Sequence, residues 1–96
     1  MRETPPVAEA IRLKLERAFR PVTLIVEDES ARHASHAGAR EGGESHFRVR
    51  IVSAAFAGLS RVERQRRVYD VLSAELAAGV HALALITLTP DEAAGI

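Results

Sequence analysis

The chain has 96 residues, of which 47% are hydrophobic and only 4% aromatic, so it can build one small domain around a mostly aliphatic core. Its zero formal net charge removes any argument for nucleic-acid binding from overall charge, and the absence of cysteine excludes a disulfide or a thiolate metal site made by this chain alone. No apolar stretch approaches the ~20 residues of a membrane span, and Pro5, Pro6 and Glu9 interrupt the N-terminus where a secretory signal would be apolar, so we expect a cytoplasmic protein.

The N-terminal segment is predicted to form a helix that begins after Thr4 and ends before Pro21. Apolar residues recur through it at helical spacing: Val7, Ile11, Leu15, Ala18 and Phe19. The next segment, 22–28 (VTLIVED), alternates between apolar and polar residues and is rich in β-branched side chains, which predicts a strand.

A long connection then separates two strands. Residues 30–43 (SARHASHAGAREGG) are small, polar and glycine-rich, which predicts a loop of about fourteen residues, longer than an ordinary hairpin turn. Residues 46–52 (HFRVRIV) follow as a second strand, with Phe47, Val49 and Ile51 expected on its inner face.

The second half of the chain predicts a helix, a strand and a final helical turn. Ser60 and Glu63 fit a capping box, and the helix that they open is expected to stop at Gly79. Segment 80–88 is apolar apart from His81 and Thr87, which favours a strand in a well-covered part of a sheet. Residues 89–92 begin a short helical turn. The apolar side of the second helix is expected to hold Val62, Val68, Tyr69, Leu72 and Leu76.

The predicted order is therefore α-β-β-α-β-α. The first two strands can pair as a hairpin, and the helical crossover favours parallel pairing between the second and the third. We predict an α+β fold, a three-stranded mixed sheet with helices packed on one face, as a single domain over residues 1–96 with short tails.

Four segments of the chain resemble the BolA family: VEDESARHA, ESHFRVRIVSAAFAGLS, RVERQRRVYDVLSAEL and GVHALALITLTPDE. They cover nearly the whole chain in the family's order, and the family's fold is related to the type II KH domain. Two features depart from its usual pattern. Gln65 stands between Arg64 and Arg66, where relatives often have histidine, and the first loop is a few residues longer and carries a second histidine.

The resemblance implies an accessory role instead of an enzyme activity. BolA-like proteins pair with monothiol glutaredoxins of the Cys-Gly-Phe-Ser type, and the heterodimer can hold a 2Fe–2S cluster to which the glutaredoxin and glutathione give sulfur. By the same resemblance the ligands from this chain would be His81 and His33. His36 is the alternate, because it lies three residues from His33 in the same predicted loop, and the isolated chain is expected to hold no cluster because it has no cysteine. A packed His81, hydrogen-bonded locally, and a solvated His33 are the competing interpretations from the residues alone. His46 is interpreted as structural or interfacial.

A cluster of arginines supports a second hypothesis. Arg61, Arg64 and Arg67 are predicted to lie on or near one side of the second helix, where they could contact phosphates of duplex DNA, an acidic partner or glutathione, or simply form a solvated face. Some BolA-like proteins are DNA-binding regulators. RNA binding of the KH type is not expected, because segment 54–60 lacks the Gly-x-x-Gly loop. The sequence leaves homodimer formation open.

Overall fold

The computed structural model describes residues 7–29, 46–80 and 82–95. The elements are α1 (Val7–Phe19), β1 (Thr23–Asp28), β2 (His46–Val52), the 3-10 turn η2 (Ala54–Phe56), α2 (Arg61–Val71), α3 (Ser73–Ala78), β3 (Ala82–Leu88) and α4 (Pro90–Ala93). Their order confirms the predicted one, except that the second helix is divided at Leu72. The predicted loop 30–43 and the expected cap Thr4 lie outside the described residues.

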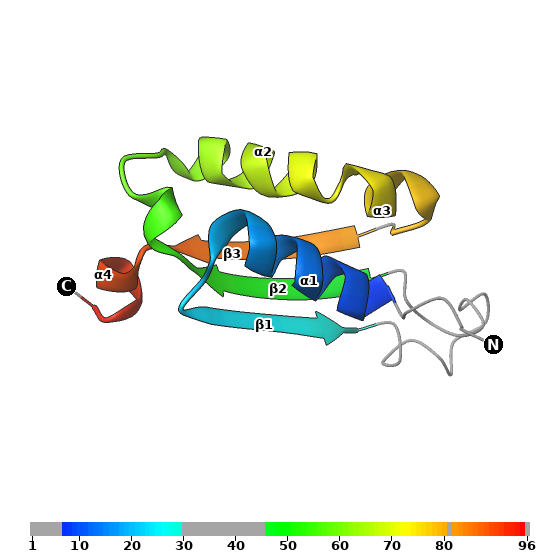
Figure 1. Ribbon diagram of the computed structural model, residues 1–96, viewed down its shortest axis with the longest axis horizontal. Coiled ribbons are helices and arrows are strands. Elements are labelled where there is room, and N and C mark those ends of the chain that lie inside the picture. Colours follow the sequence, from blue (N-terminus) through cyan, green and yellow to red (C-terminus); the bar gives the residue numbers. More distant parts are fainter. Residues whose placement is uncertain (1–6, 30–45, 81, 96) are drawn as a thin grey trace.

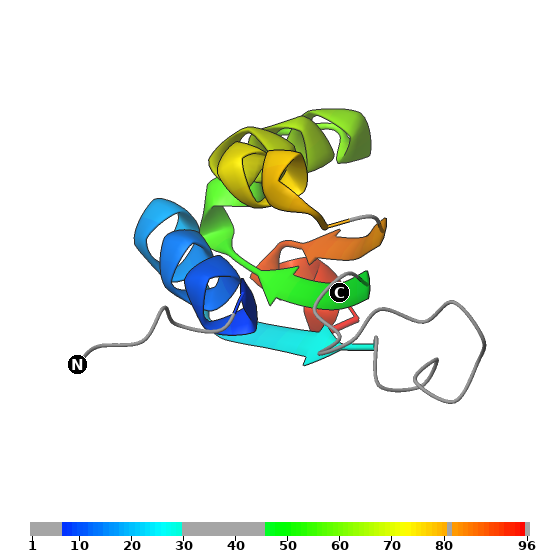
Figure 2. The same cartoon turned by 90° about the vertical axis from the view of Figure 1, so that its right-hand side faces the viewer.

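The sheet has the strand order β1-β2-β3. β1 pairs with β2 in antiparallel fashion, β2 pairs with β3 in parallel, and the register aligns Ile25, Arg50 and Ile86 in one row across the strands. Figures 1 and 2 show α1, α2 and α3 on the same side of this sheet. The α+β prediction of a mixed sheet with helices on one face is therefore confirmed.

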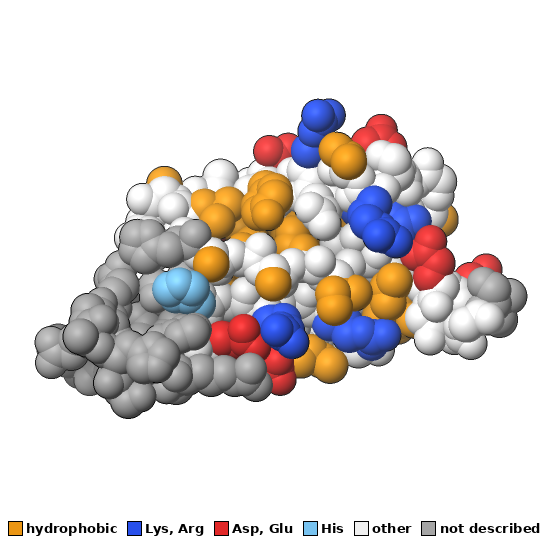
Figure 3. Space-filling view, turned by 180° about the vertical axis from the view of Figure 1, so that it is seen from behind, with side chains coloured by type: hydrophobic (Ala, Val, Ile, Leu, Met, Phe, Trp, Pro, Cys, Tyr) orange, Lys and Arg blue, Asp and Glu red, His pale blue; other side chains and the backbone are white. Residues whose placement is uncertain are grey.

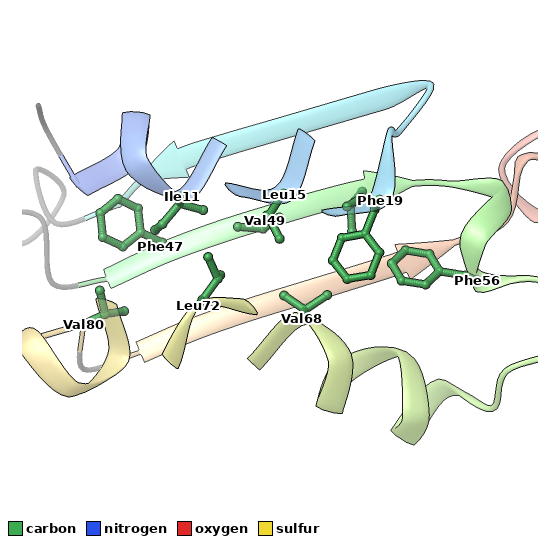
Figure 4. Close-up of a cluster of buried hydrophobic side chains, with 10 residues drawn as sticks. Ile11, Leu15, Phe19, Phe47, Val49, Phe56, Val68, Leu72 and Val80 are labelled. Atoms are coloured by element: carbon green, nitrogen blue, oxygen red, sulfur yellow. The ribbon is translucent and has the colours of Figure 1, made fainter. Parts of the chain in front are cut away.

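The hydrophobic core lies between the helices and the sheet (Figure 4). Ile11, Leu15 and Phe19 follow one another at intervals of four along α1, so they share the face that is turned to the sheet, and all three are buried. The tilted rings of Phe19 and Phe56, with centroids 5.1 Å apart, close the core where α1 meets η2. Burial of each such side chain contributes about 1.5–3 kcal/mol. The other buried apolar members are Phe47, Val49, Ile51, Val68, Leu72 and Val80.

The helix boundaries follow the signals in the sequence. Arg20 has a positive φ of 45°, donates its N–H to the Glu16 carbonyl at 3.0 Å and precedes Pro21, so α1 ends where it was predicted to end. The capping box at the start of α2 is also confirmed: the Ser60 hydroxyl accepts from the Glu63 N–H at 3.1 Å, and the Glu63 carboxylate accepts from the Ser60 N–H at 2.9 Å.

The prediction of the apolar side of the second helix was partly wrong. Val62 and Tyr69 are 59% and 38% exposed. The row that faces the sheet runs instead through Arg64, Val68 and Leu72, each four residues from the next and each buried. The long side chain of Arg64 thus occupies a place that the sequence pattern assigned to apolar residues.

The expectation that β3 lies in a well-covered part of the sheet was also wrong. β3 is an edge strand, and Ala82, Ala84 and Ile86 on its outer face are exposed. The sequence of β3 is apolar at successive positions because its outer face carries alanines. Helices nevertheless cover only its inner face. No described helix is both long enough and apolar enough to cross a membrane.

Candidate functional site

The three histidines that the sequence singles out, His33, His36 and His81, all lie outside the described residues. What the structure does describe are the chain positions next to them. Glu29 precedes the segment that contains the two loop histidines, His46 follows that segment, and Ala82 follows His81.

These flanking positions meet at one end of the sheet. The Glu29 N–H donates to the His46 carbonyl at 2.8 Å, and His46 is the register partner of Ala82 in the parallel pair. Figure 1 shows the end of β1, the start of β2 and the start of β3 at the same end of the molecule. The pairing of the strands therefore brings both ends of the 30–45 segment to the place where β3 begins.

The described side chains at this end are anchored by apolar packing on one face and by ion pairing on the other. Val80 and Phe47 are 8% and 2% exposed and belong to the core. On the face without helices, the Arg48 guanidinium lies 3.3 Å from a carboxylate oxygen of Glu29. The backbone at Val80 is therefore held in place by a buried side chain.

The composition of the chain limits the kinds of metal site that it could complete. Among the described residues there is no group of three or more His, Asp or Glu side chains that could hold a metal ion. The whole chain has four histidines and no cysteine. Imidazole nitrogens can replace thiolates on one iron of a 2Fe–2S cluster, but the sulfur ligands of the other iron have to come from another molecule.

Arg64 does not belong to a basic docking surface, and its inclusion with Arg61 and Arg67 was wrong. Its side chain is buried, its Nε donates to the Leu59 carbonyl at 3.0 Å, and its Nη1 donates to the Thr87 carbonyl at 3.1 Å. The same guanidinium makes a two-pronged ion pair with the Glu92 carboxylate, at 2.7 and 3.1 Å. The contacts with Thr87 and Glu92 tie α2 to β3 and α4, so the role of Arg64 is structural.

The basic surface that remains on α2 is smaller and mixed in charge. Arg61 and Arg67 are exposed, and so is Arg66. Glu63 lies among them, and its pKa is lowered, first by the Ser60 backbone N–H and to a smaller extent by Arg67. The carboxylate therefore stays ionised near neutral pH and offsets part of the arginine charge.

Sequence reasoning missed the ion pair between Arg64 and Glu92. Two signals pointed to it. Arg64 precedes Val68, which was expected on the apolar side of the helix, by four residues, and Thr89 and Glu92 repeat the capping-box spacing seen at Ser60 and Glu63. The carboxylate of Glu92 is held near the end of β3 because Glu92 also accepts from the Thr89 N–H at 2.9 Å.

The amino-acid sequence is similar to those of known proteins. The sequence profile described as BolA-like protein matches residues 15–92. The chain is 51% identical over 86 residues to SufE-like protein 1, chloroplastic/mitochondrial, of Arabidopsis thaliana, an alignment that covers 85% of this chain. It is 41% identical over 86 residues to the DNA-binding transcriptional regulator BolA of Haemophilus influenzae, which covers 90% of this chain and 80% of that protein.

Solved structures show the same fold. BolA1 from Arabidopsis thaliana superimposes with a TM-score of 0.81 at 44% sequence identity, over 96% of this chain and 98% of that one. Some relatives are much longer. The chain spans only 23% of the length of the SufE-like protein and 54% of the chloroplastic protein BOLA1 from the same plant.

Proposed function

The chain belongs to the family of BolA-like proteins, and from this membership we propose that it is an accessory protein of iron–sulfur or iron homeostasis. In this proposal it forms a heterodimer with a monothiol glutaredoxin of the Cys-Gly-Phe-Ser type. It lends imidazole nitrogen from His81 and His33, with His36 as the alternate, to a 2Fe–2S cluster whose sulfur comes from the glutaredoxin and from glutathione. The role is non-catalytic, and its setting is the cytoplasm.

One observation carries the proposal beyond family membership. The hydrogen bond between Glu29 and His46, together with the register of His46 with Ala82, brings the ends of the histidine-bearing segment and the residue after His81 to one end of the sheet. A chain with histidines but no cysteine can complete an iron site with another molecule and cannot build a thiolate site alone. Imidazole ligation generally raises the reduction potential of such a cluster.

The test is spectroscopy on the heterodimer formed with a cluster-loaded monothiol glutaredoxin. Addition of the parent protein should change the visible absorption and circular dichroism of the cluster. His81→Ala and His33→Ala should each alter the resulting spectrum, whereas His36→Ala should leave it as in the parent. His46→Ala is the matched control, because this histidine lies at the same end of the sheet and is expected to be structural.

The outcomes separate the parts of the proposal. If His36→Ala changed the spectrum and His33→Ala did not, the loop ligand would be His36. A cluster spectrum that is the same for the parent and for the triple variant lacking His33, His36 and His81 would contradict histidine ligation altogether.

A second candidate function is DNA binding in transcriptional regulation, favoured by the exposed Arg61 and Arg67 on α2. The Haemophilus relative that carries this description is 41% identical.

Phosphate contacts would make the affinity for DNA fall as salt is added, with a slope of log K against log salt of about −0.9 for each contact. In a titration against labelled duplex DNA, the double variant Arg61→Ala/Arg67→Ala should bind more weakly and with a shallower slope. Arg17→Ala, at an exposed arginine of α1, is the control. Absence of binding by the parent at micromolar protein and low salt would exclude this function.

A further inference from the structure

The two edges of the sheet differ in charge. β1 carries Glu27 and Asp28 near its end, and charged side chains on an edge strand oppose pairing with another chain. β3 has the sequence ALALITL, without a charged residue from Ala82 to Leu88. An apolar edge strand of this kind is open to pairing with a further strand.

The backbone pattern shows which groups β3 presents at this edge. In a parallel pair, alternate residues direct both N–H and C=O toward the neighbouring strand. The Leu88 carbonyl accepts from the Ser53 N–H at 2.9 Å, at the end of β2, so Leu88, Ile86 and Ala84 direct their backbone groups to β2. The residues between them, in particular Leu83 and Leu85, therefore direct their N–H and C=O groups away from the sheet.

Thr87 supports this assignment and limits the open part of the edge. Its carbonyl, which by alternation also points away from β2, is the one that accepts from Arg64 at 3.1 Å. Within the described part of the chain, no hydrogen bond takes the outward backbone groups of Leu83 and Leu85. The free edge is thus the short stretch around Leu83 and Leu85, and it ends at Thr87, whose carbonyl is bonded to Arg64.

Exposed apolar side chains flank this edge on both sides. On β3 itself, Ile86 is 46% exposed. On α2, the exposed Val62 and Tyr69 are seven residues apart and so share one side of the helix. The flank that faces α1 is a different one, which is marked by the ion pair between Glu75 of α3 and Lys14 of α1 at 2.8 Å. Figure 3, seen from the side away from α1, shows hydrophobic side chains gathered over α2 and over β3.

We infer that the free edge of β3 pairs with β3 of a second copy of this chain, in antiparallel orientation about a two-fold axis at Ala84. In this register Leu83 lies opposite Leu85 of the second copy. The outward N–H and C=O groups of these two residues, which have no contact with Arg64, then form the hydrogen bonds between the strands. Charge favours a second copy as the occupant. The paired strands carry no charge, and the chain has zero formal net charge, so whole-molecule repulsion does not oppose self-association.

The inference does not depend on the proposed function, because its evidence lies in β3 and α2. The dimer joins two three-stranded sheets into one continuous sheet, with α1, α2 and α3 of both copies on one side. Val62 and Tyr69 then come to lie between the α2 helices of the two copies, which removes exposed apolar area from water.

The test is sedimentation velocity of the full chain over a range of concentrations, with substitutions at the exposed Ala84. The parent should shift with rising concentration toward twice its 10.4 kDa mass. Ala84→Lys alone and Ala84→Glu alone should each remain monomeric, because like charges directly opposite each other in an antiparallel pair repel. An equimolar mixture of the two variants should recover the dimer. Ile25→Lys is the matched control, because Ile25 is 45% exposed on the same face of the sheet but lies on β1.

Two results would overturn the inference. One is a parent that stays monomeric up to several hundred micromolar. The other is a dimer that both single variants at Ala84 retain, with circular dichroism showing that they are folded. Tyr69 is the only tyrosine of a chain without tryptophan, so its fluorescence gives a second readout, which should change with concentration in the parent and not in Ala84→Lys.

Discussion

At the scale of single residues, the same type of side chain has different roles according to its position on the helix. Arg61 and Arg67 are solvent-exposed, whereas Arg64 is buried and bonded to two backbone carbonyls and to Glu92. A guanidinium presents several donors in a fixed plane, so it can bond to groups from several segments of the chain at once. Arg64 is therefore a joint between α2, β3 and α4.

This joint makes stability depend on pH in a defined range. The Arg64 guanidinium, and then the Thr89 N–H, lower the pKa of Glu92 from 4.5 to about 2. Because the folded-state value lies below the unfolded one, the contribution of Glu92 is complete above pH 4.5 and is lost as the pH falls from there to about 2.

Glu92→Gln should therefore be less stable than the parent at pH 7, and the difference should shrink on acidification. Urea unfolding at pH 7, 4 and 3 measures it. Asp91→Asn, at the neighbouring exposed acid of α4, should show a much smaller effect. A stability difference for Glu92→Gln that is constant with pH would argue against the ion pair.

At the scale of elements, short polar motifs decide where the helices begin and end. The boxes at Ser60 and Glu63 and at Thr89 and Glu92 each satisfy backbone N–H groups that have no partner within the helix. Where a sequence carries such a motif, the boundary can be predicted from a few neighbouring residues. The division between α2 and α3 at Leu72 has no comparable motif, and it was not predicted.

The cap of α2 predicts a measurable loss. Ser60→Ala removes the acceptor for the Glu63 N–H and should lower the free energy of unfolding by about 1 kcal/mol. Ser60→Asp, which keeps an acceptor at this position, should retain most of the stability. Thermal or urea unfolding of the three proteins measures the difference, and equal stability of Ser60→Ala and the parent would show that this cap is dispensable.

At the scale of the whole molecule, one layer of helices covers one face of the sheet, and this arrangement separates stability from interaction. The covered face holds the buried core, with Phe47, Val49 and Ile51 of β2 at its centre. On the other face Ile25, Arg48 and Ile86 are exposed, and β3 lies at an edge of the sheet. Substitutions on the covered side should therefore affect folding, and those at the exposed edge of β3 should affect association.

A pair of leucines in α1 tests this separation. Leu15 is fully buried and Leu13 is 37% exposed. Leu15→Ala should cost about 2–5 kcal/mol through lost burial and the cavity left behind, whereas Leu13→Ala should cost well under 1 kcal/mol. Equilibrium unfolding in urea measures both, and similar losses at the two positions would contradict the orientation of α1.

The sequence by itself determined the order of the elements, the pairing of the strands and most of the helix ends. These features depend on periodicity and on contacts between near neighbours, which can be read along the chain. It also identified His33, His36 and His81 as candidate ligands through the resemblance to the BolA family, and those assignments remain predictions.

Only the tertiary structure decided the role of Arg64, the exposure of Val62 and Tyr69, and the position of β3 at an edge. Each depends on which element packs opposite a residue. Glu92 lies 28 positions from Arg64 along the chain, and the apolar sequence of β3 does not reveal whether a neighbour covers its outer face. Local patterns fix the direction of a side chain relative to its own helix or strand, whereas its burial and its partners are fixed by contacts between distant parts of the chain.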